Sequence, residues 1–279
     1  MFLARLSGQT ATVVVDHSVG SFTNAVSLSA NAAGEVFVLD AGTNELLKFS
    51  PKGTLLSKIG GRGWGDLSFD SPTDVCASFA LDVYVADYNN RRLQRFDRKL
   101  NFVQSLNIDN IGTTFSGGFT PCASAISSQG ELFILEADGR RVVKLNPAGQ
   151  IEREFGSFDA GAGSLASPRD IAVTQSGKVV VLDTHRAIEF DTYANFLSAI
   201  PFDPAFAPLS LNVDDRGIVV TDPRRIVRYS FDGRMEFDLT SGSVMGLENS
   251  VEFRDACVVG SFLYILTPKN ILATKIAPR

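Results

Sequence analysis

The sequence predicts an all-β fold in which six similar units form one ring, and three observations predict it. A short apolar run closed by an acidic residue occurs five times, ending at Asp40, Asp87, Glu136, Asp183 and Asp222. A sixth run ends at Thr267, and the six end positions lie 47, 49, 47, 39 and 45 residues apart. Turns containing Pro and Gly recur between the runs. A period near 45 with β-rich runs is typical of a six-bladed β-propeller.

Each unit has the pattern of a four-stranded antiparallel sheet. A first strand follows a proline turn, as at Pro72, and the second strand is the apolar run, which we expect to be covered on both faces. The third strand carries a basic residue before an apolar one, as at Lys48, and a Pro- and Gly-containing turn leads to an alternating fourth strand, as at 151–155. We expect one propeller domain over 1–279, with blades at 22–60, 72–107, 121–156, 168–200, 208–240, and 251–279 together with 2–16.

Ring closure follows from the same pattern, because no single unit can bury both of its faces. After Thr267 the chain retains enough residues for one more strand, at Ile271 to Lys275. We expect this segment to be the third strand of the last blade and Thr12 to Val15 to be its fourth, so that the two chain ends pair in one blade. The alternative is that Phe2 to Leu6 supplies the third strand.

The composition argues against several classes of function. The 279 residues carry 26 basic and 31 acidic side chains, a net charge of -5. This balance disfavours general nucleic-acid binding and adsorption to anionic membranes, which both depend on clustered Lys and Arg. The chain has no apolar run long enough to span a membrane. Cys76, Cys122 and Cys257 form no metal or disulfide pattern, so we expect buried free thiols.

The N-terminal residues lack the charged, apolar and cleavage regions of a signal peptide. We therefore expect a cytoplasmic protein on the chain as given. If Met1 replaces a removed signal peptide, the protein would be exported or periplasmic.

One family resemblance rests on the second unit. Pro72, Asp74 and Val75 precede the run 83–87, and Asn90, Arg91, Arg92, Leu93 and Phe96 follow it, with the Gly-rich link 60–65 upstream. This pattern resembles an NHL repeat. The resemblance implies a six-bladed ring used mostly to bind proteins, peptides or RNA. A minority of proteins with a related fold are enzymes. These are the peptidylglycine amidating lyases and, more distantly, lactonases of the gluconolactonase and regucalcin type.

A second group of candidates is acidic. The starts of the first strands align at Asn24, Asp74, Ala123, Asp170, Ser210 and Asp255, around one mouth of the ring. Asn24, Asp74, Asp170 and Asp255 could together hold Ca²⁺ through oxygen ligands and support a lactonase-type hydrolase. We prefer the interpretation in which these side chains satisfy turn amides or face channel water. The strand-closing acids recur in almost every unit, which is typical of a structural device and not of a single ligand site.

The remaining chemistry is sparse. The only histidines are His17 and His185, too few for the zinc site of the amidating lyases, and no GxSxG motif is present. Tyr88, Asn90 and Arg91 could stack on and contact RNA, although the acidic total disfavours it. Trp64 is expected to lie buried under the edge of the ring, with an exposed aromatic anchor as the alternative.

These patterns predict a non-catalytic scaffold that binds a protein or peptide partner. The expected surface is the face formed by the Gly-rich links and by the turns between second and third strands. The residues expected to contact the partner are Trp64, Tyr88, Asn90, Arg91, His185 and Arg186. We expect no cofactor, with Ca²⁺ in the acidic funnel as the alternative, and we do not expect nucleic acid as the partner.

Overall fold

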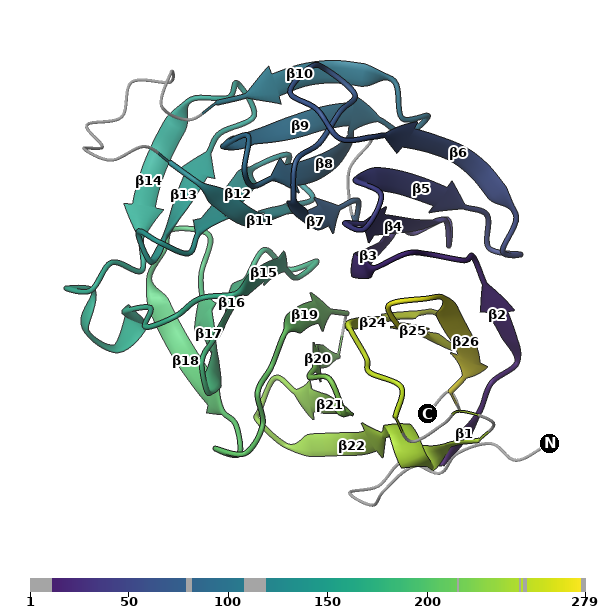
Figure 1. The fold of residues 1–279 in the computed structure, drawn as a ribbon. Coiled ribbons are helices and arrows are strands. Elements are labelled where there is room, and N and C mark those ends of the chain that lie inside the picture. Colours follow the sequence, from purple (N-terminus) through teal and green to yellow (C-terminus); the bar gives the residue numbers. More distant parts are fainter. Residues whose placement is uncertain are drawn as a thin grey trace.

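Six four-stranded antiparallel sheets surround a central channel in the computed structural model of the chain (Figure 1). The structure describes residues 12–78, 82–107, 119–214, 216–245, 247 and 250–276. Each of blades 1 to 5 uses four consecutive strands, from the channel outward. The predicted six-bladed β-propeller is therefore confirmed.

The strands of each blade are as follows. Blade 1 contains β3 (Ala25–Ala30), β4 (Val36–Asp40), β5 (Glu45–Phe49) and β6 (Leu55–Gly60). Blade 2 contains β7 (Pro72–Cys76), β8 (Asp82–Asp87), β9 (Arg92–Asp97) and β10 (Phe102–Leu106). Blade 3 contains β11 (Pro121–Ile126), β12 (Leu132–Glu136), β13 (Arg141–Leu145) and β14 (Ile151–Phe155). Blade 4 contains β15 (Asp170–Val173), β16 (Val179–Asp183), β17 (Arg186–Phe190) and β18 (Phe196–Pro201).

Blade 5 contains β19 (Ser210–Val213), β20 (Gly217–Thr221), β21 (Arg225–Ser230) and β22 (Met235–Thr240). Blade 6 contains β24 (Asp255–Val259), β25 (Phe262–Leu266) and β26 (Ile271–Lys275), and its outer strand is β2 (His17–Val19) from the other end of the chain. Two further short strands, β1 (Val13–Val14) and β23 (Val244–Met245), pair in parallel beside blades 5 and 6 (Figure 1).

Ring closure corrects one prediction and confirms another. β26 pairs with β25, so Ile271–Lys275 is the third strand as predicted. The assignment of Thr12 to Val15 as the fourth strand is wrong, because β2 pairs with β26 instead. Val13 is buried against Val244 in the core between blades 5 and 6, whereas an outer strand, with one face in water, suits the mostly polar β2. Phe2 to Leu6 lie outside the described residues.

The core lies between blades, and the second strands are its most completely buried elements. All residues of β4, β12, β16 and β20 are buried, as their unbroken apolar runs predict. Between blades 1 and 2, Phe37 packs with Phe69 and Phe96 in one cluster. Cys76, Cys122 and Cys257 are all free, and burial raises the pKa of the Cys76 and Cys122 thiols to about 12. No helix in the described ranges has the length and apolar character needed to cross a membrane.

The acids that close the second strands organise one face of the ring. Asp40 accepts hydrogen bonds from the backbone N–H groups of Thr23 and Asn24 at 2.7 and 2.8 Å, just before the first strand begins. Asp183 does the same for Ala166 and Ser167. Asp40 and Asp183 therefore tie the entering link to the end of the second strand, whereas Asp222 accepts from Arg224 and Arg225 in the turn that follows it. These bonds support the structural interpretation of the repeated acids. We call this face, formed by the interblade links and the turns between second and third strands, the loop-rich face.

The assignment of β2 as the closing strand can be tested by substitution. Val19 is 6% exposed and packs with Phe22, Phe49 and Tyr264, whereas Val14 is 48% exposed. Val19→Ala should lower the free energy of unfolding by about 1–3 kcal/mol through lost burial. Val14→Ala should change it by less than about 0.5 kcal/mol. Urea unfolding measures both, and a Val19→Ala variant as stable as the wild type would contradict the assignment.

Candidate functional site

The central channel is lined by the first strand of every blade. These strands have no neighbour on their inner edge, so their backbone N–H groups need other partners. Pairing with the second strands places six residues at one level: Ser27, Asp74, Ala123, Asp170, Ser210 and Asp255. The ring therefore alternates a small residue in blades 1, 3 and 5 with an aspartate in blades 2, 4 and 6.

This register corrects the alignment of Asn24. The residue of blade 1 that is equivalent to Asp74 is Ser27, and Asn24 lies exposed before β3 begins. The same irregularity occurs in β7 and β11, so Ala25 is equivalent to Pro72 and Pro121, and Asn24 precedes the strand. Asn24 therefore does not join the three aspartates in the channel.

Each aspartate links its own blade to the next one. Asp74 accepts a hydrogen bond from the backbone N–H of Ser124 in blade 3 at 2.9 Å. Asp170 accepts one from Leu211 in blade 5 at 2.6 Å. In the same way, Asp255 accepts one from Leu28 in blade 1 at 2.8 Å, across the closure of the ring.

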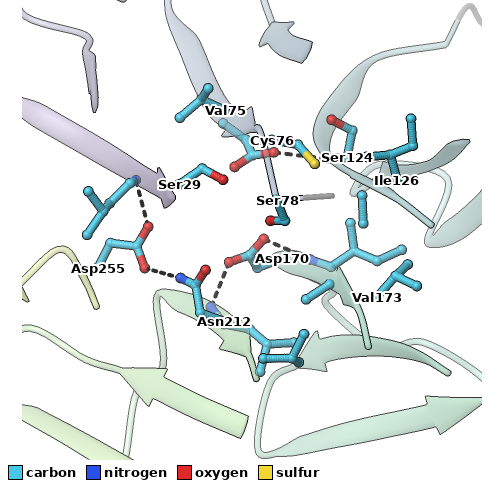
Figure 2. Close-up of a pocket in the computed structure, with 17 residues that line it drawn as sticks. Ser29, Val75, Cys76, Ser78, Ser124, Ile126, Asp170, Val173, Asn212 and Asp255 are labelled. Atoms are coloured by element: carbon cyan, nitrogen blue, oxygen red, sulfur yellow. Dashed lines mark hydrogen bonds between the residues drawn. The ribbon is translucent and has the colours of Figure 1, made fainter. Parts of the chain in front are cut away.

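The second oxygens of these carboxylates are also used. Asp74 accepts a hydrogen bond from the Ser27 hydroxyl at 3.0 Å. Asp170 accepts one from the N–H of Ile171 at 2.7 Å, and Asp255 accepts one from the Asn212 side chain at 2.8 Å. Figure 2 shows Asp170 and Asp255 on the same cavity with Asn212 between them.

Burial and mutual repulsion perturb the three carboxyl groups. Burial raises the pKa of Asp74 to about 6 and that of Asp255 to about 7. Burial, followed by the nearby charges of Asp74 and Asp255, raises the pKa of Asp170 well above its ordinary value. A protonated carboxyl group is therefore much more populated here at neutral pH than on the surface.

Two cavities adjoin the ring of aspartates. A cavity of about 290 Å³ is lined by Thr73, Arg169 and Ser210 together with the three aspartates. Below it, a cavity of about 50 Å³ also contacts Ser124 and Asn212 and has room for only a few water molecules (Figure 2). Within the described ranges, no group of three or more His, Cys, Asp or Glu is arranged to hold a metal ion. The observed hydrogen bonds show the aspartates joining blades.

The loop-rich face carries all six residues predicted to contact a partner, and Trp64 differs most from expectation. Trp64 is 81% exposed in the link between β6 and β7, so the prediction that it is buried is wrong. Phe69 of the same link takes the buried place, fully covered and edge-on to Phe96 at 6.0 Å. The backbone N–H of Gly63 donates to the carbonyl of Phe69, which leaves Trp64 at the tip of the link.

The turn between β8 and β9 holds the Trp64 link. Asn90 donates to the carbonyl of Gly63 at 2.9 Å and to Asp87 at 2.8 Å. Arg92 donates to the carbonyl of Gly65 at 2.9 Å and to Asp87. Asn90 therefore serves the fold, whereas Arg91 of the same turn is exposed and Tyr88 is half-buried.

A second aromatic residue stands on the equivalent link of another blade. Phe158, in the link between β14 and β15, is 87% exposed. Arg186 donates to the carbonyl of Ser164 in this link at 2.8 Å, so it also serves the fold, and its neighbour His185 is exposed. Trp64 and Arg91 are thus the exposed residues of one link and its neighbouring turn, and Phe158 and His185 are those of another. Sequence reasoning missed Phe158, although an aromatic residue in a Gly-rich link was the signal already used for Trp64.

The fold and this face define the class of protein, a six-bladed β-propeller whose exposed aromatic residues stand on interblade links. The NHL repeat family model matches residues 69–96, the end of the first link and the first three strands of blade 2. The chain therefore carries an NHL repeat, and the resemblance predicted from sequence is confirmed.

Similar proteins agree with this assignment. The chain is 29% identical over 144 residues to Protein brain tumor of Drosophila melanogaster, a match covering 50% of this chain and 13% of that protein. It is 28% identical over 143 residues to the B-box type zinc finger protein ncl-1 of Caenorhabditis elegans, covering 50% of this chain and 16% of that protein. The chain thus matches a small part of the length of these relatives.

Among solved structures, virginiamycin B lyase from Staphylococcus aureus superposes with a TM-score of 0.66 at 13% identity, over 93% of this chain and 99% of that one. At this level of identity the likeness shows the fold alone.

The raised pKa of Asp74 predicts a pH dependence of stability. Because its pKa is about 6 when folded and 3.8 ordinarily, the native state binds more protons between these values, so wild-type stability falls as the pH rises through this range. Asp74→Asn, which does not titrate, should gain up to about 3 kcal/mol relative to the wild type between pH 4 and pH 7. Urea unfolding at both pH values measures this gain.

The matched control is Asp97→Asn, in an exposed turn where hydrogen bonds from Asn101 lower the pKa of Asp97. This variant should show no gain as the pH rises. A stability difference between Asp74→Asn and wild type that is constant with pH would contradict the burial of a titrating group at Asp74.

Proposed function

We propose that the chain is a non-catalytic interaction module that binds a protein or peptide partner through its loop-rich face. The observation that carries this proposal is the exposure of Trp64 and Phe158, 81% and 87%, on equivalent links of the same face. Large aromatic side chains dominate the binding energy of protein interfaces, and here two of them stand on equivalent links of one face.

The links that present these aromatics are held in place before any partner arrives. Asn90 and Arg92 bind backbone carbonyls of the Trp64 link, and Arg186 binds the Phe158 link. Ordered links lower the conformational entropy lost on binding, which favours affinity. The matches to Protein brain tumor and ncl-1, which cover half of this chain, support a role as one module of a larger protein.

The charges on the loop-rich face indicate what kind of surface the partner presents. Arg62, Arg91, Arg140 and Arg169 are exposed on its links and turns, with Asp66, Asp138 and Asp159 among them. The mixed pattern suits a protein surface with paired charges around an aromatic contact. Among the residues that the structure describes, it offers no unbroken basic track of the kind that follows a nucleic-acid backbone.

A funnel enzyme is the second candidate. It is favoured by the near-neutral pKa values of Asp74 and Asp255 beside a cavity of about 290 Å³. Against it, both oxygens of each channel aspartate already accept hydrogen bonds within the ring. We therefore rank it below the interaction module.

Recovery of the protein from its own cells tests the proposal. A stoichiometric companion quantified by mass spectrometry should accompany the wild type and fall at least tenfold with the double variant Trp64→Ala, Phe158→Ala, because each aromatic anchor is worth about 2 kcal/mol or more. Tyr193→Ala is the matched control, since Tyr193 is 70% exposed in a turn on the opposite face. Retention of the companion by the double variant, or a wild type that is recovered alone, would overturn the proposal.

A further inference from the structure

On the face opposite the loop-rich face, an ion pair recurs between the third strand and the residue just before the second strand. It joins Lys48 to Glu35 at 2.9 Å in blade 1, Arg95 to Asp82 at 2.8 Å in blade 2, and Lys144 to Glu131 at 2.7 Å in blade 3. In blade 4 the charges are exchanged, with Glu189 on the third strand and Lys178 before the second, 3.5 Å apart. The pair thus recurs in blades 1 to 4, with its polarity reversed in blade 4, whereas the equivalent positions in blades 5 and 6 are Gly217 and Phe262.

In two blades the lysine also closes the crevice to the next blade. Lys48 Nζ donates to the carbonyl of Arg98 in blade 2 at 2.8 Å, and Lys144 Nζ donates to the carbonyl of Thr192 in blade 4 at 2.9 Å. Both acceptors occupy the second position of the turn between the third and fourth strands. The lysine side chains are 9% and 4% exposed, so each fills the space between its blade and the next.

The crevice between blades 2 and 3 is built differently. Its third-strand cation is Arg95, which turns back to Asp82 and remains 35% exposed. The turn carbonyl equivalent to those of Arg98 and Thr192 belongs to Pro147, and no described side chain donates to it. A cavity of about 590 Å³ is left between the blades, and we call it the blade 2–3 crevice.

The blade 2–3 crevice is lined by apolar side chains on its floor and by charged and polar groups on its walls. Leu106, Ile126, Leu132 and Leu145 are all less than 10% exposed and form an apolar floor. Asp82 and Arg95 stand at one wall, and the turns 127–130 and 146–149 form the other. The volume lies within the roughly 300–1,000 Å³ of ordinary ligand pockets.

We propose that the blade 2–3 crevice binds an extended, uncharged peptide segment of a protein partner. Asp82 and Arg95 neutralise each other, so a charged group entering the crevice would lose its hydration without a net opposite charge to compensate. A peptide amide satisfies both, because its carbonyl accepts from Arg95 and its N–H donates to the free oxygen of Asp82 or to the Pro147 carbonyl. A small aliphatic side chain of the segment then covers the apolar floor.

This site is separate from the proposed function of the loop-rich face. The crevice opens where the first strand turns into the second and the third into the fourth, which is the opposite rim of the ring. The two sites can therefore fail independently in experiment.

The decisive variant is Arg95→Lys. A lysine at this position can reach the Pro147 carbonyl, as Lys48 and Lys144 reach their equivalents, and thereby close the crevice. Ser128→Trp fills the crevice from its exposed turn without touching the core. Gln175→Trp is the matched control, since Gln175 occupies the equivalent turn position in blade 4, beside the crevice that Lys144 closes.

The probe is a phage-displayed library of random heptapeptides, selected on the immobilised wild-type protein and followed by fluorescence polarisation with the synthetic selected peptides. We expect peptides with uncharged centres that bind at least tenfold more weakly to Arg95→Lys and to Ser128→Trp. Binding should be unchanged for Gln175→Trp and for the Trp64→Ala, Phe158→Ala variant. Thermal unfolding should show Arg95→Lys to be as stable as the wild type. Failure to enrich any peptide, or peptides that bind Arg95→Lys within twofold of the wild type, would overturn the proposal.

Discussion

The open inner edge of the first strands is the constraint on which the ring depends. The outer edge of each fourth strand lies at the rim of the ring, whereas the six first strands face one another across the channel and form no ladder with each other. In blades 3, 5 and 1, an N–H group of the first strand is satisfied by an aspartate of the preceding blade, Asp74, Asp170 or Asp255. These aspartates span every second junction, and the Ser or Ala residues between them keep the carboxyl groups apart. At the junction between blades 1 and 2, Ser27 and Ser29 accept from N–H groups of blade 2 instead. This arrangement removes three carboxyl groups from water. Because burial disfavours the charged form, the pKa values of all three are raised.

The same device, used at a different place, builds the loop-rich face. Asp40, Asp87 and Asp183 stand at the ends of second strands and accept hydrogen bonds from the link that enters each blade. Each of these links also places one apolar side chain in the core, Phe22, Phe69 or Leu165, so the acids and the core together order it. Ordered by the acids and by Asn90, Arg92 and Arg186, they expose Trp64 and Phe158 in fixed positions. The residues that recur in every blade therefore serve the fold, and the functional candidates are those that differ between blades.

The fold could be predicted from the sequence because the apolar run and its flanking turns occur six times. Six copies at a spacing near 45 residues would not arise by chance. The errors fell where one copy departs from the rest. Asp74, Ala123 and Asp170 each precede their strand-closing acid by 13 residues, and the same count back from Asp40 arrives at Ser27, not at Asn24. β2 was missed because His17 and Ser18 lack the apolar character of the neighbouring valines, which a polar outer strand does not require. The exposure of Trp64 depended on Phe69 taking the buried place, a competition between two aromatics that only packing decides.

A carbon-13 NMR titration of the side-chain carboxyl groups, with Asp74, Asp170 and Asp255 assigned through their asparagine variants, tests the central claim most directly. If these groups are buried hydrogen-bond acceptors between blades, the signals of Asp74 and Asp255 titrate near pH 6 and pH 7, and that of Asp170 titrates well above the value of about 3.9 for an ordinary aspartate. If instead all three titrate near pH 4, the carboxyl groups are solvated and the blades are joined in another way.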